Sequence, residues 1–188
     1  MTTSPDESLW VLRAQCGDRQ ALELLLRSIQ PSLLRYLRGL AGADAADDLL
    51  QDVLVLLYRK LGWLRDPAMF RPWAFRIASR TGFRHLKRKH GLPRNVGEDT
   101  LETMASAEPR PSSDELDLLS TIEGVSPASR AVLVLHFREE MTLSEVAAVL
   151  ELPIGTVRSR LAYGLATLRK QLSDHKRSDD GRAQESNR

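Results

Sequence analysis

The chain has 188 residues, 42% of them hydrophobic, so it is long enough for one medium-sized domain or two small ones with buried cores. Its net charge of +2 indicates no partner by itself, and its apolar runs fall far short of the ~20 residues that span a membrane. Residues 1–10 lack the basic and apolar parts of a secretory signal. The single cysteine, Cys16, excludes an internal disulfide and is expected to be a small buried side chain. These features predict a cytoplasmic protein.

Helices are predicted along almost the whole chain, because apolar residues recur at helical spacing and strict alternation is absent. The helices expected in the first half cover residues 7–16, 18–30, 31–40, 45–61 and 70–90. Pro31 suits the first turn of a helix, so it is expected to begin a new one. Together these helices predict an N-terminal domain over residues 1–90.

A change of composition follows this domain. Residues 91–113 are rich in proline and glycine and poor in apolar side chains, which predicts a flexible linker. Further helices are expected at residues 114–123, 127–139, 143–150 and 154–172, where Ser126-Pro127 and the capping box Thr142-x-x-Glu145 mark two starts. The fold class is therefore all-α, with a second domain at 114–172 and a disordered polar tail at 173–188.

Charge is strongly segregated along the chain. Residues 71–94 carry eight Lys and Arg and no Asp or Glu, whereas residues 98–115 carry six acids against one arginine. Residues 154–172 return to four cations and no acid. Two basic segments that flank an acidic linker indicate that the protein binds a polyanion.

The stretch TLSEVAAVLELPIGTVRSRL, residues 142–161, has the pattern of a helix-turn-helix. Ala147 is the small residue needed where the two helices cross, and Val157, ten positions later, ties the second helix into the core. Four polar residues lie early in that second helix: Thr156, Arg158, Ser159 and Arg160. Such side chains bind guanine edges and phosphates in a major groove. A plain helical hairpin with solvated arginines would show a similar pattern.

A cationic stripe is predicted on residues 70–90, since four cations recur there at a spacing of three or four: Arg76, Arg80, Arg84 and Lys87. Such a stripe can follow a phosphate backbone. Trp63, Met69 and Phe70 lie in or beside the preceding loop, and the two aromatic side chains among them can stack on unpaired bases. A solvated helix face and core aromatics are the alternative.

The helix expected at residues 45–61 has a polar face that suits a protein partner, made of Asp48, Gln51, Asp52 and Val55. An ordinary solubilising face is the alternative for this helix taken alone. Its acids also suit the positive end of the helix dipole.

Three segments in their order along the chain indicate a protein family more specifically than any one of them does. They read DDLLQDVLVLLYRKL, FRPWAFRIASRTGFRHLKRKH and SPASRAVLVLHFREEMTLSEVAAVLELPIGTVRSRL, in this order. The chain resembles, over about residues 9–172, the extracytoplasmic-function (ECF) group of the sigma-70 family of bacterial sigma factors. The resemblance implies a protein that binds core RNA polymerase and directs it to promoters, opens promoter DNA, and is commonly held by an anti-sigma factor. It implies no cofactor and no catalytic residue.

The resemblance also implies roles for single residues. Core polymerase would be bound by Asp48, Leu49, Gln51 and Asp52. The melted minus-ten element would be bound by Trp63, Trp73, Arg76, Arg80, Arg84 and Lys87. The duplex minus-thirty-five element would be bound by Thr156, Arg158, Ser159 and Arg160. The acidic linker would lie in the polymerase channels that hold nucleic acid.

Departures from the family pattern occur at Glu151, where glycine is usual in the turn, and at Gly82, where a helix former is common. Residues 162–170 are also less basic than usual. A stand-alone helix-turn-helix regulator is the main alternative function, although it would not need the N-terminal features. An enzyme is disfavoured, because the four histidines show no metal-ligand spacing and no phosphate loop or nucleophile motif is present.

Overall fold

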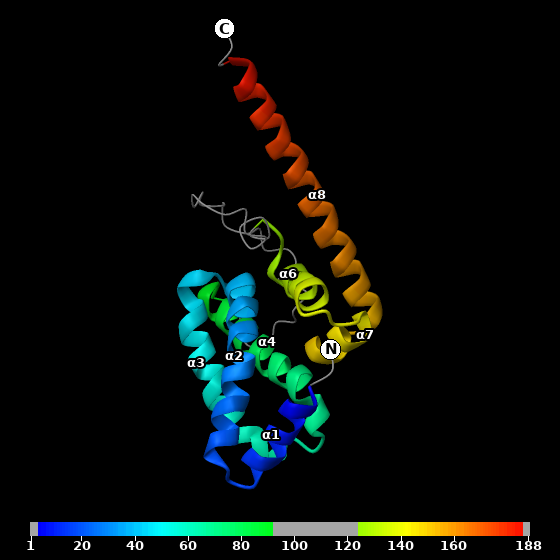
Figure 1. Ribbon diagram of the computed structural model, residues 1–188. Coiled ribbons are helices and arrows are strands. Elements are labelled where there is room, and N and C mark those ends of the chain that lie inside the picture. Colours follow the sequence, from blue (N-terminus) through cyan, green and yellow to red (C-terminus); the bar gives the residue numbers. More distant parts are fainter. Residues whose placement is uncertain (1–3, 92–123, 186–188) are drawn as a thin grey trace.

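The computed structural model describes residues 4–91 and 124–185, and every regular element in these two ranges is helical, which confirms the all-α prediction (Figure 1). The N-terminal part contains α1 (Pro5–Gln15), α2 (Arg19–Ala41), α3 (Ala43–Lys60), the short η1 (Leu61–Trp63) and η2 (Pro67–Met69), and α4 (Phe70–Lys89). The C-terminal part contains α6 (Pro127–Leu133), the π-helical turn η4 (Val134–Arg138), α7 (Leu143–Leu150) and α8 (Ile154–Glu185). The predicted linker at 91–113 and the predicted helix at 114–123 lie almost wholly outside the described residues.

The N-terminal core lies between α2, α3 and α4, with α1 packed across α2 (Figure 1). Tyr36 of α2 is fully buried, and its ring meets the edge of the Phe75 ring at a centroid distance of 5.6 Å. The Tyr36 hydroxyl lies 2.7 Å from the Ser79 hydroxyl, so its polar group is satisfied inside the core. These contacts fix α4, which carries the predicted cationic stripe, against α2.

The prediction of two separate helices around Pro31 is wrong, because α2 runs unbroken through that residue. A proline inside a helix removes one backbone hydrogen bond and costs ~3 kcal/mol. Leu25 and Ile29 before Pro31 and Leu33 and Leu37 after it are all fully buried in the same core. Burial of this continuous apolar stripe offsets the local cost.

The packing around Gly82 explains why a glycine stands there in place of a helix former. A Cβ atom added at Gly82 would lie 2.6 Å from Leu40 Cδ2, so the absence of a side chain allows α4 to approach α2 closely. Gly155, in the first turn of α8, would meet nothing within 4 Å.

The two glycines make a matched pair for a stability measurement. Gly82→Ala is expected to lower the free energy of unfolding by about 1 kcal/mol, because overpacking costs more than helix propensity returns. Gly155→Ala is expected to raise it by up to ~1 kcal/mol. Urea unfolding of the two variants checks the prediction, and a stabilised Gly82→Ala protein would contradict the close packing.

The helix α6 begins where the sequence predicts a helix start. The Ser126 hydroxyl accepts a hydrogen bond from the Ser129 amide at 3.4 Å, Pro127 occupies the first turn, and residues 125–135 are all buried. The predicted helix at 127–139 is divided into α6 and η4. The prediction of a disordered tail from residue 173 is wrong as far as Glu185, because α8 continues to that residue and projects from the molecule (Figure 1). No proline follows Pro153 to end the helix.

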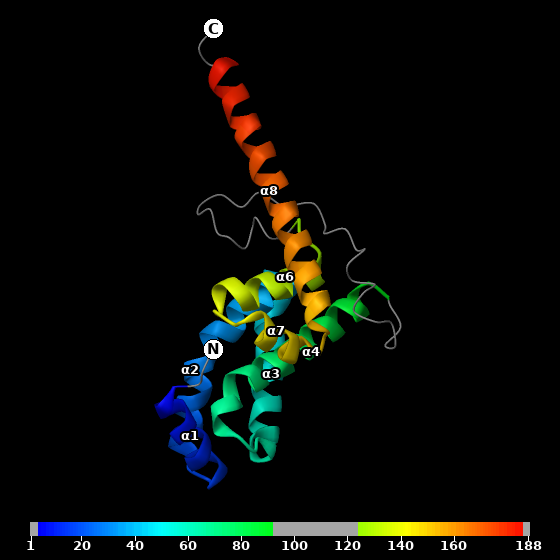
Figure 2. The ribbon, with the colours of Figure 1, turned by 90° about the vertical axis from the view of Figure 1, so that its right-hand side faces the viewer.

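The two helical parts pack directly on each other. The helix α6 lies against α2, and α7 lies against α4, as two perpendicular views show (Figures 1 and 2). Their buried apolar side chains form one continuous cluster, which includes Leu37 and Phe75 from the first part and Leu135 and Val149 from the second. The structure therefore shows a closed conformation, in which the N-terminal and C-terminal parts are in contact.

Candidate functional site

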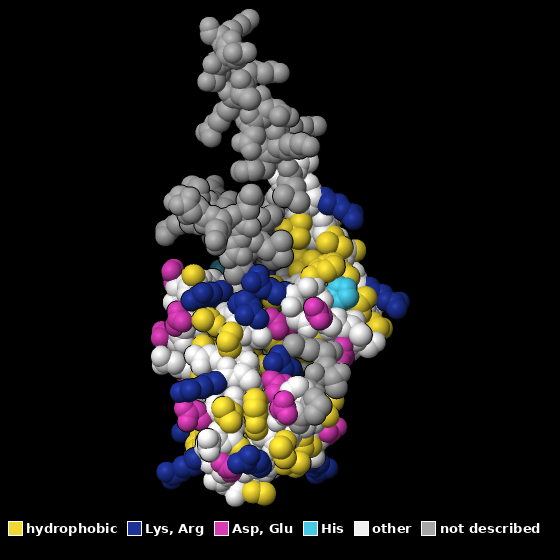
Figure 3. All heavy atoms as spheres, in the orientation of Figure 1, with side chains coloured by type: hydrophobic (Ala, Val, Ile, Leu, Met, Phe, Trp, Pro, Cys, Tyr) yellow, Lys and Arg dark blue, Asp and Glu magenta, His cyan; other side chains and the backbone are white. Residues whose placement is uncertain are grey.

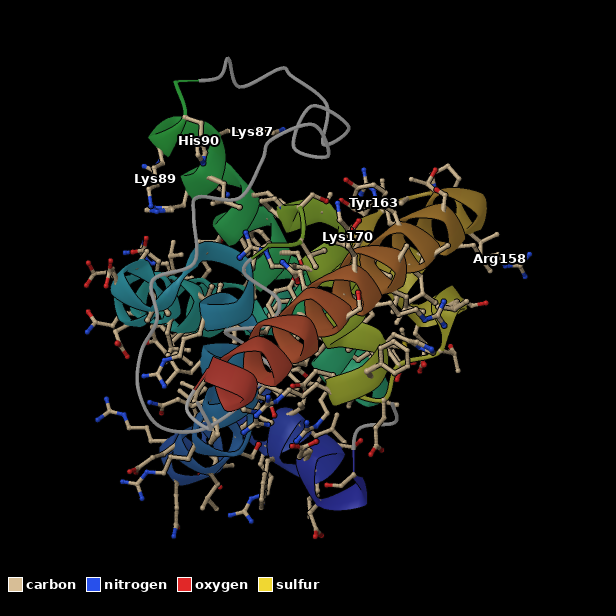
Figure 4. The ribbon with its side chains drawn as sticks, turned by 90° about the horizontal axis from the view of Figure 1, so that it is seen from above. Lys87, Lys89, His90, Arg158, Tyr163 and Lys170 are labelled. Carbon is tan, nitrogen blue, oxygen red and sulfur yellow. The ribbon has the colours of Figure 1, made fainter. Side chains whose placement is uncertain are left out.

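The cationic stripe of α4 begins at the contact between the two parts. Arg76 is partly buried, whereas Arg80 and Arg84 are exposed. Arg76 Nη2 donates to the Ala148 backbone oxygen at 3.0 Å. Figure 4 shows Lys87 near the C-terminal end of α4 with Lys89 and His90. The cations of the predicted minus-ten site thus extend along α4 from the α7 contact to the C-terminal end of this helix.

The aromatic loop before α4 presents one exposed ring on a fixed backbone. Trp63 is 78% exposed at the end of η1. The backbone beside it is held by Gln15 Nε2, which donates to the Leu61 oxygen at 2.9 Å and to the Leu64 oxygen at 2.8 Å. Trp73, by contrast, is partly buried. Trp63 therefore has the geometry of a stacking platform, and Trp73 mainly packs on the core.

Most of the predicted polymerase-binding residues lie on the exposed face of α3. Asp48, Gln51 and Asp52 are exposed. Leu49 is only 3% exposed and belongs to the core, so the expectation that its side chain contacts a partner is wrong for this conformation. Tyr58, which was not among the predicted site residues, is 63% exposed on α3. Its position seven residues after Gln51, close to two helical turns, was the available signal.

The helix-turn-helix forms as predicted. In the capping box, the Glu145 amide donates to the Thr142 hydroxyl at 3.2 Å and the Thr142 amide donates to the Glu145 carboxylate at 2.7 Å. Val157 is fully buried, as expected for the residue that anchors the second helix. Glu151 adopts φ 57° and ψ 43°, the left-handed region that favours glycine. The turn therefore keeps the usual backbone shape at a cost of roughly 1–2 kcal/mol.

The four predicted minus-thirty-five residues do not share one environment. Arg158 and Ser159 are exposed, and Thr156 is partly exposed. Figure 4 shows Arg158 near the start of α8, across the molecule from the α4 cations. Arg160 is only 1% exposed, so the expectation that it faces DNA is wrong for this conformation. It lies three positions after Val157, and this spacing turns both side chains toward the interior.

A buried ion pair fixes α1 to α4. Arg71 Nε donates to Glu7 Oε2 at 2.8 Å, and Arg71 Nη2 donates to Glu7 Oε1 at 2.7 Å. The Ser28 hydroxyl of α2 donates to the same carboxylate at 3.0 Å. Burial acts to raise the pKa of Glu7, but the hydrogen bonds and charge of Arg71 outweigh it, so this pKa lies below its ordinary value. The pair therefore positions the start of α4.

Two acidic residues of the C-terminal part face arginines of the N-terminal part. Glu151 binds Arg80 through Oε1 and Nη2 at 2.6 Å and through Oε2 and Nε at 3.1 Å. Glu139 is 2% exposed, and its Oε1 lies 3.9 Å from Arg35 Nη2. On the face shown in Figure 3, acidic and cationic side chains are mixed, so the charge segregation of the sequence is not repeated there.

The sites for a metal ion, a membrane span and a buried cysteine can be checked in residues 4–91 and 124–185. No group of three or more His, Cys, Asp or Glu side chains in these ranges is arranged to hold a metal ion. Among the described helices, none is long and apolar enough to cross a membrane. Cys16 is exposed at the end of α1, so the expectation that it is buried is wrong. The turn that follows α1 places it at the surface.

Comparisons with known proteins agree with this arrangement. Residues 25–91 match the family described as Sigma-70 region 2, and residues 121–170 match Sigma-70, region 4. The RNA polymerase sigma-H factor of Pseudomonas aeruginosa is 29% identical, over 92% of this chain and 96% of that protein. The ECF RNA polymerase sigma-E factor of Escherichia coli K12 is 26% identical, over 86% of this chain and 91% of that protein.

Two solved structures have the same fold. CnrH in complex with the cytosolic domain of CnrY aligns with a TM-score of 0.64 and 25% identity, over 90% of this chain and 98% of that one. The sigma factor RpoE of Bartonella quintana, in complex with the anti-sigma factor NepR, aligns with a TM-score of 0.62 and 25% identity. This alignment covers 80% of this chain and 96% of that one. The chain therefore belongs to the ECF group of the sigma-70 family and is an RNA polymerase sigma factor.

Proposed function

We propose that this sigma factor binds core RNA polymerase through α3 and opens promoter DNA through α4 and the loop that precedes it. The proposal rests mainly on the exposure of Trp63. Its side chain is 78% exposed on a fixed loop, and the helix that follows this loop is lined with arginines. A base that leaves the duplex can stack on Trp63 while Arg80 and Arg84 bind the backbone. Stacking in this site offsets part of the stacking lost on melting.

The minus-thirty-five element is read as duplex by the start of α8 in this proposal. Arg158 and Ser159 are exposed there, and Thr156 is partly exposed. Arg158 can bind guanine edges, and the hydroxyl groups can bind phosphates. Arg160 and Leu49 are not assigned contacts, because both side chains are buried. Residues 1–90 and 114–172 act as separate domains on DNA, joined by residues 91–113.

Replacement of Trp63 tests the melting role. Trp63→Ala is expected to reduce open-complex formation about tenfold, since stacking on an aromatic side chain contributes roughly 1–3 kcal/mol per base. Trp63→Phe keeps an aromatic ring and is expected to retain most activity. Permanganate footprinting of unpaired thymines measures opening, and an unchanged footprint with Trp63→Ala would remove this residue from the mechanism.

The proposed setting is the cytoplasm, where the chain acts without catalytic chemistry or a cofactor of its own. An anti-sigma factor is a proposed partner, supported by the two similar structures, which hold CnrY and NepR. Affinity capture of the chain from its own cells would identify such a protein. A stand-alone regulator, by contrast, would bind duplex DNA without core polymerase.

Comigration with core polymerase tests the function as a whole. The purified chain is expected to form a complex with bacterial core polymerase on gel filtration, and that complex is expected to retain a promoter fragment after a heparin challenge. The free chain is expected to retain none. Tight duplex binding by the free chain without any core complex would favour the stand-alone regulator.

A further inference from the structure

The contact between Arg80 and Glu151 joins the two predicted DNA-binding regions. Arg80 is in the cationic stripe of α4, and Glu151 is in the turn that leads into the recognition helix α8. The Arg80 guanidinium donates to the Glu151 carboxylate at N–O distances of 2.6–3.1 Å. Arginine binds a phosphate in the same bidentate geometry. The carboxylate therefore occupies the donors with which Arg80 would contact DNA.

Glu151 is an unfavourable residue for its own backbone position. Its φ of 57° is left-handed, a conformation that glycine adopts without cost. Its backbone amide and carbonyl would serve the turn equally well with glycine, whereas its side chain makes the bidentate contact to the other domain. The side chain thus contributes to the contact between domains and not to the turn.

The closed conformation cannot read both promoter elements at once. We expect the two promoter elements bound by the two parts to lie about two helical turns apart, which is about 70 Å of duplex. In the structure, Glu151 touches Arg80 and lies only a few residues before Thr156 and Arg158. Residues 92–123 between the two parts can span on the order of 100 Å when fully extended, at ~3.3–3.6 Å per residue, so the connection permits separation.

We propose that Glu151 holds the free protein closed by binding Arg80, so that part of the basic face of α4 is shielded until the two domains separate. The shielding of a minus-ten surface rests on the function proposed above for Arg80; the closure itself does not. The neighbouring bond from Arg76 Nη2 to the Ala148 oxygen shields a second arginine of the same stripe. Separation exposes both guanidinium groups together.

Two other glutamates of the same domain provide matched controls. Glu140 is exposed, has a φ of 54°, and makes no ion pair among the described residues. Glu139 is buried at the domain contact, and this burial raises the pKa of its carboxyl. The polar groups that face it and act in the opposite direction are Arg35, Arg71, Ser32 and Arg138. Because Arg35 is 39% exposed and lies 3.9 Å from Glu139, this ion pair is weak, and neutral glutamine at position 139 is expected to keep closure.

Energy transfer between dyes measures the closure directly. One dye is attached to Cys16, the only cysteine, and the other to Ala166→Cys on the exposed side of α8. Glu151→Gln is expected to lower the ratio of closed to open protein about two- to fivefold, as for an exposed ion pair. Glu151→Arg is expected to lower it further, because repulsion replaces attraction. The exchange Arg80→Glu with Glu151→Arg is expected to restore closure, and Glu140→Gln and Glu139→Gln are expected to retain it.

Binding of oligothymidylate by the free protein measures the shielding. Glu151→Gln is expected to tighten this binding about two- to fivefold relative to Glu140→Gln, because apparent affinity follows the fraction of open protein. Equal energy transfer in Glu151→Gln, Glu151→Arg and Glu140→Gln would overturn the closure. Altered transfer with unchanged oligothymidylate affinity would overturn the shielding. If no variant binds oligothymidylate although transfer responds as expected, the minus-ten function of α4 fails and the closure stands.

Discussion

Asp48→Asn combined with Asp52→Asn is expected to weaken binding of core polymerase about 30-fold and to abolish transcription at limiting polymerase. Both carboxylates are exposed on α3, and two interface charges that contribute about 1 kcal/mol each give a factor of this size. The amide keeps the side-chain shape, so the helix should be retained. Fluorescence anisotropy of the labelled chain, titrated with core polymerase, measures the affinity.

Asp44→Asn is the control for this experiment. Asp44 is exposed in the first turn of the same helix and lies outside the proposed interface. Its variant is expected to bind polymerase as the parent does, and surface substitutions of this kind usually change stability by less than ~0.5 kcal/mol. If the double variant binds polymerase normally while it remains folded, the α3 face is not the interface.

Glu7→Gln is expected to lower the free energy of unfolding by about 3 kcal/mol. The change removes the Glu7 carboxylate from Arg71, whose side chain is 16% exposed, and the loss of one member of a buried pair costs roughly 3–5 kcal/mol. Glu7→Gln combined with Arg71→Met removes the buried charge as well and is expected to recover most of the loss. Urea unfolding measures both. A single variant as stable as the parent would show that the pair contributes little.

The same pair predicts a dependence on pH. The pKa of Glu7 lies below its ordinary value in the folded protein, so protons bind Glu7 more readily in the unfolded chain. Its contribution to stability is therefore present above the ordinary value of 4.5 and is lost as pH falls through the folded-state pKa. The difference in stability between the parent and Glu7→Gln should shrink over that acidic range. A difference that stays constant below pH 4.5 would exclude this linkage.

The sequence predicted helices well where spacing and caps agree. Thr142 and Glu145 located the start of α7, and the aromatic and cationic residues located the loop and α4. It failed at Pro31, because the apolar stripe that carries α2 through this residue is a tertiary effect. It also failed at Leu49 and Arg160, whose burial depends on which side of a helix packs. The contact of Arg80 with Glu151 joins residues far apart in sequence, so no local pattern indicates it.

Transcription start mapping tests whether the chain directs core polymerase to promoters. The purified chain is added to bacterial core polymerase with a pool of genomic fragments, and the new transcript ends are sequenced. We expect new starts that share two upstream motifs about two helical turns apart, and none with core polymerase alone. No new starts and no comigration with core polymerase, together with tight binding to duplex DNA, would show that the chain does not direct the polymerase.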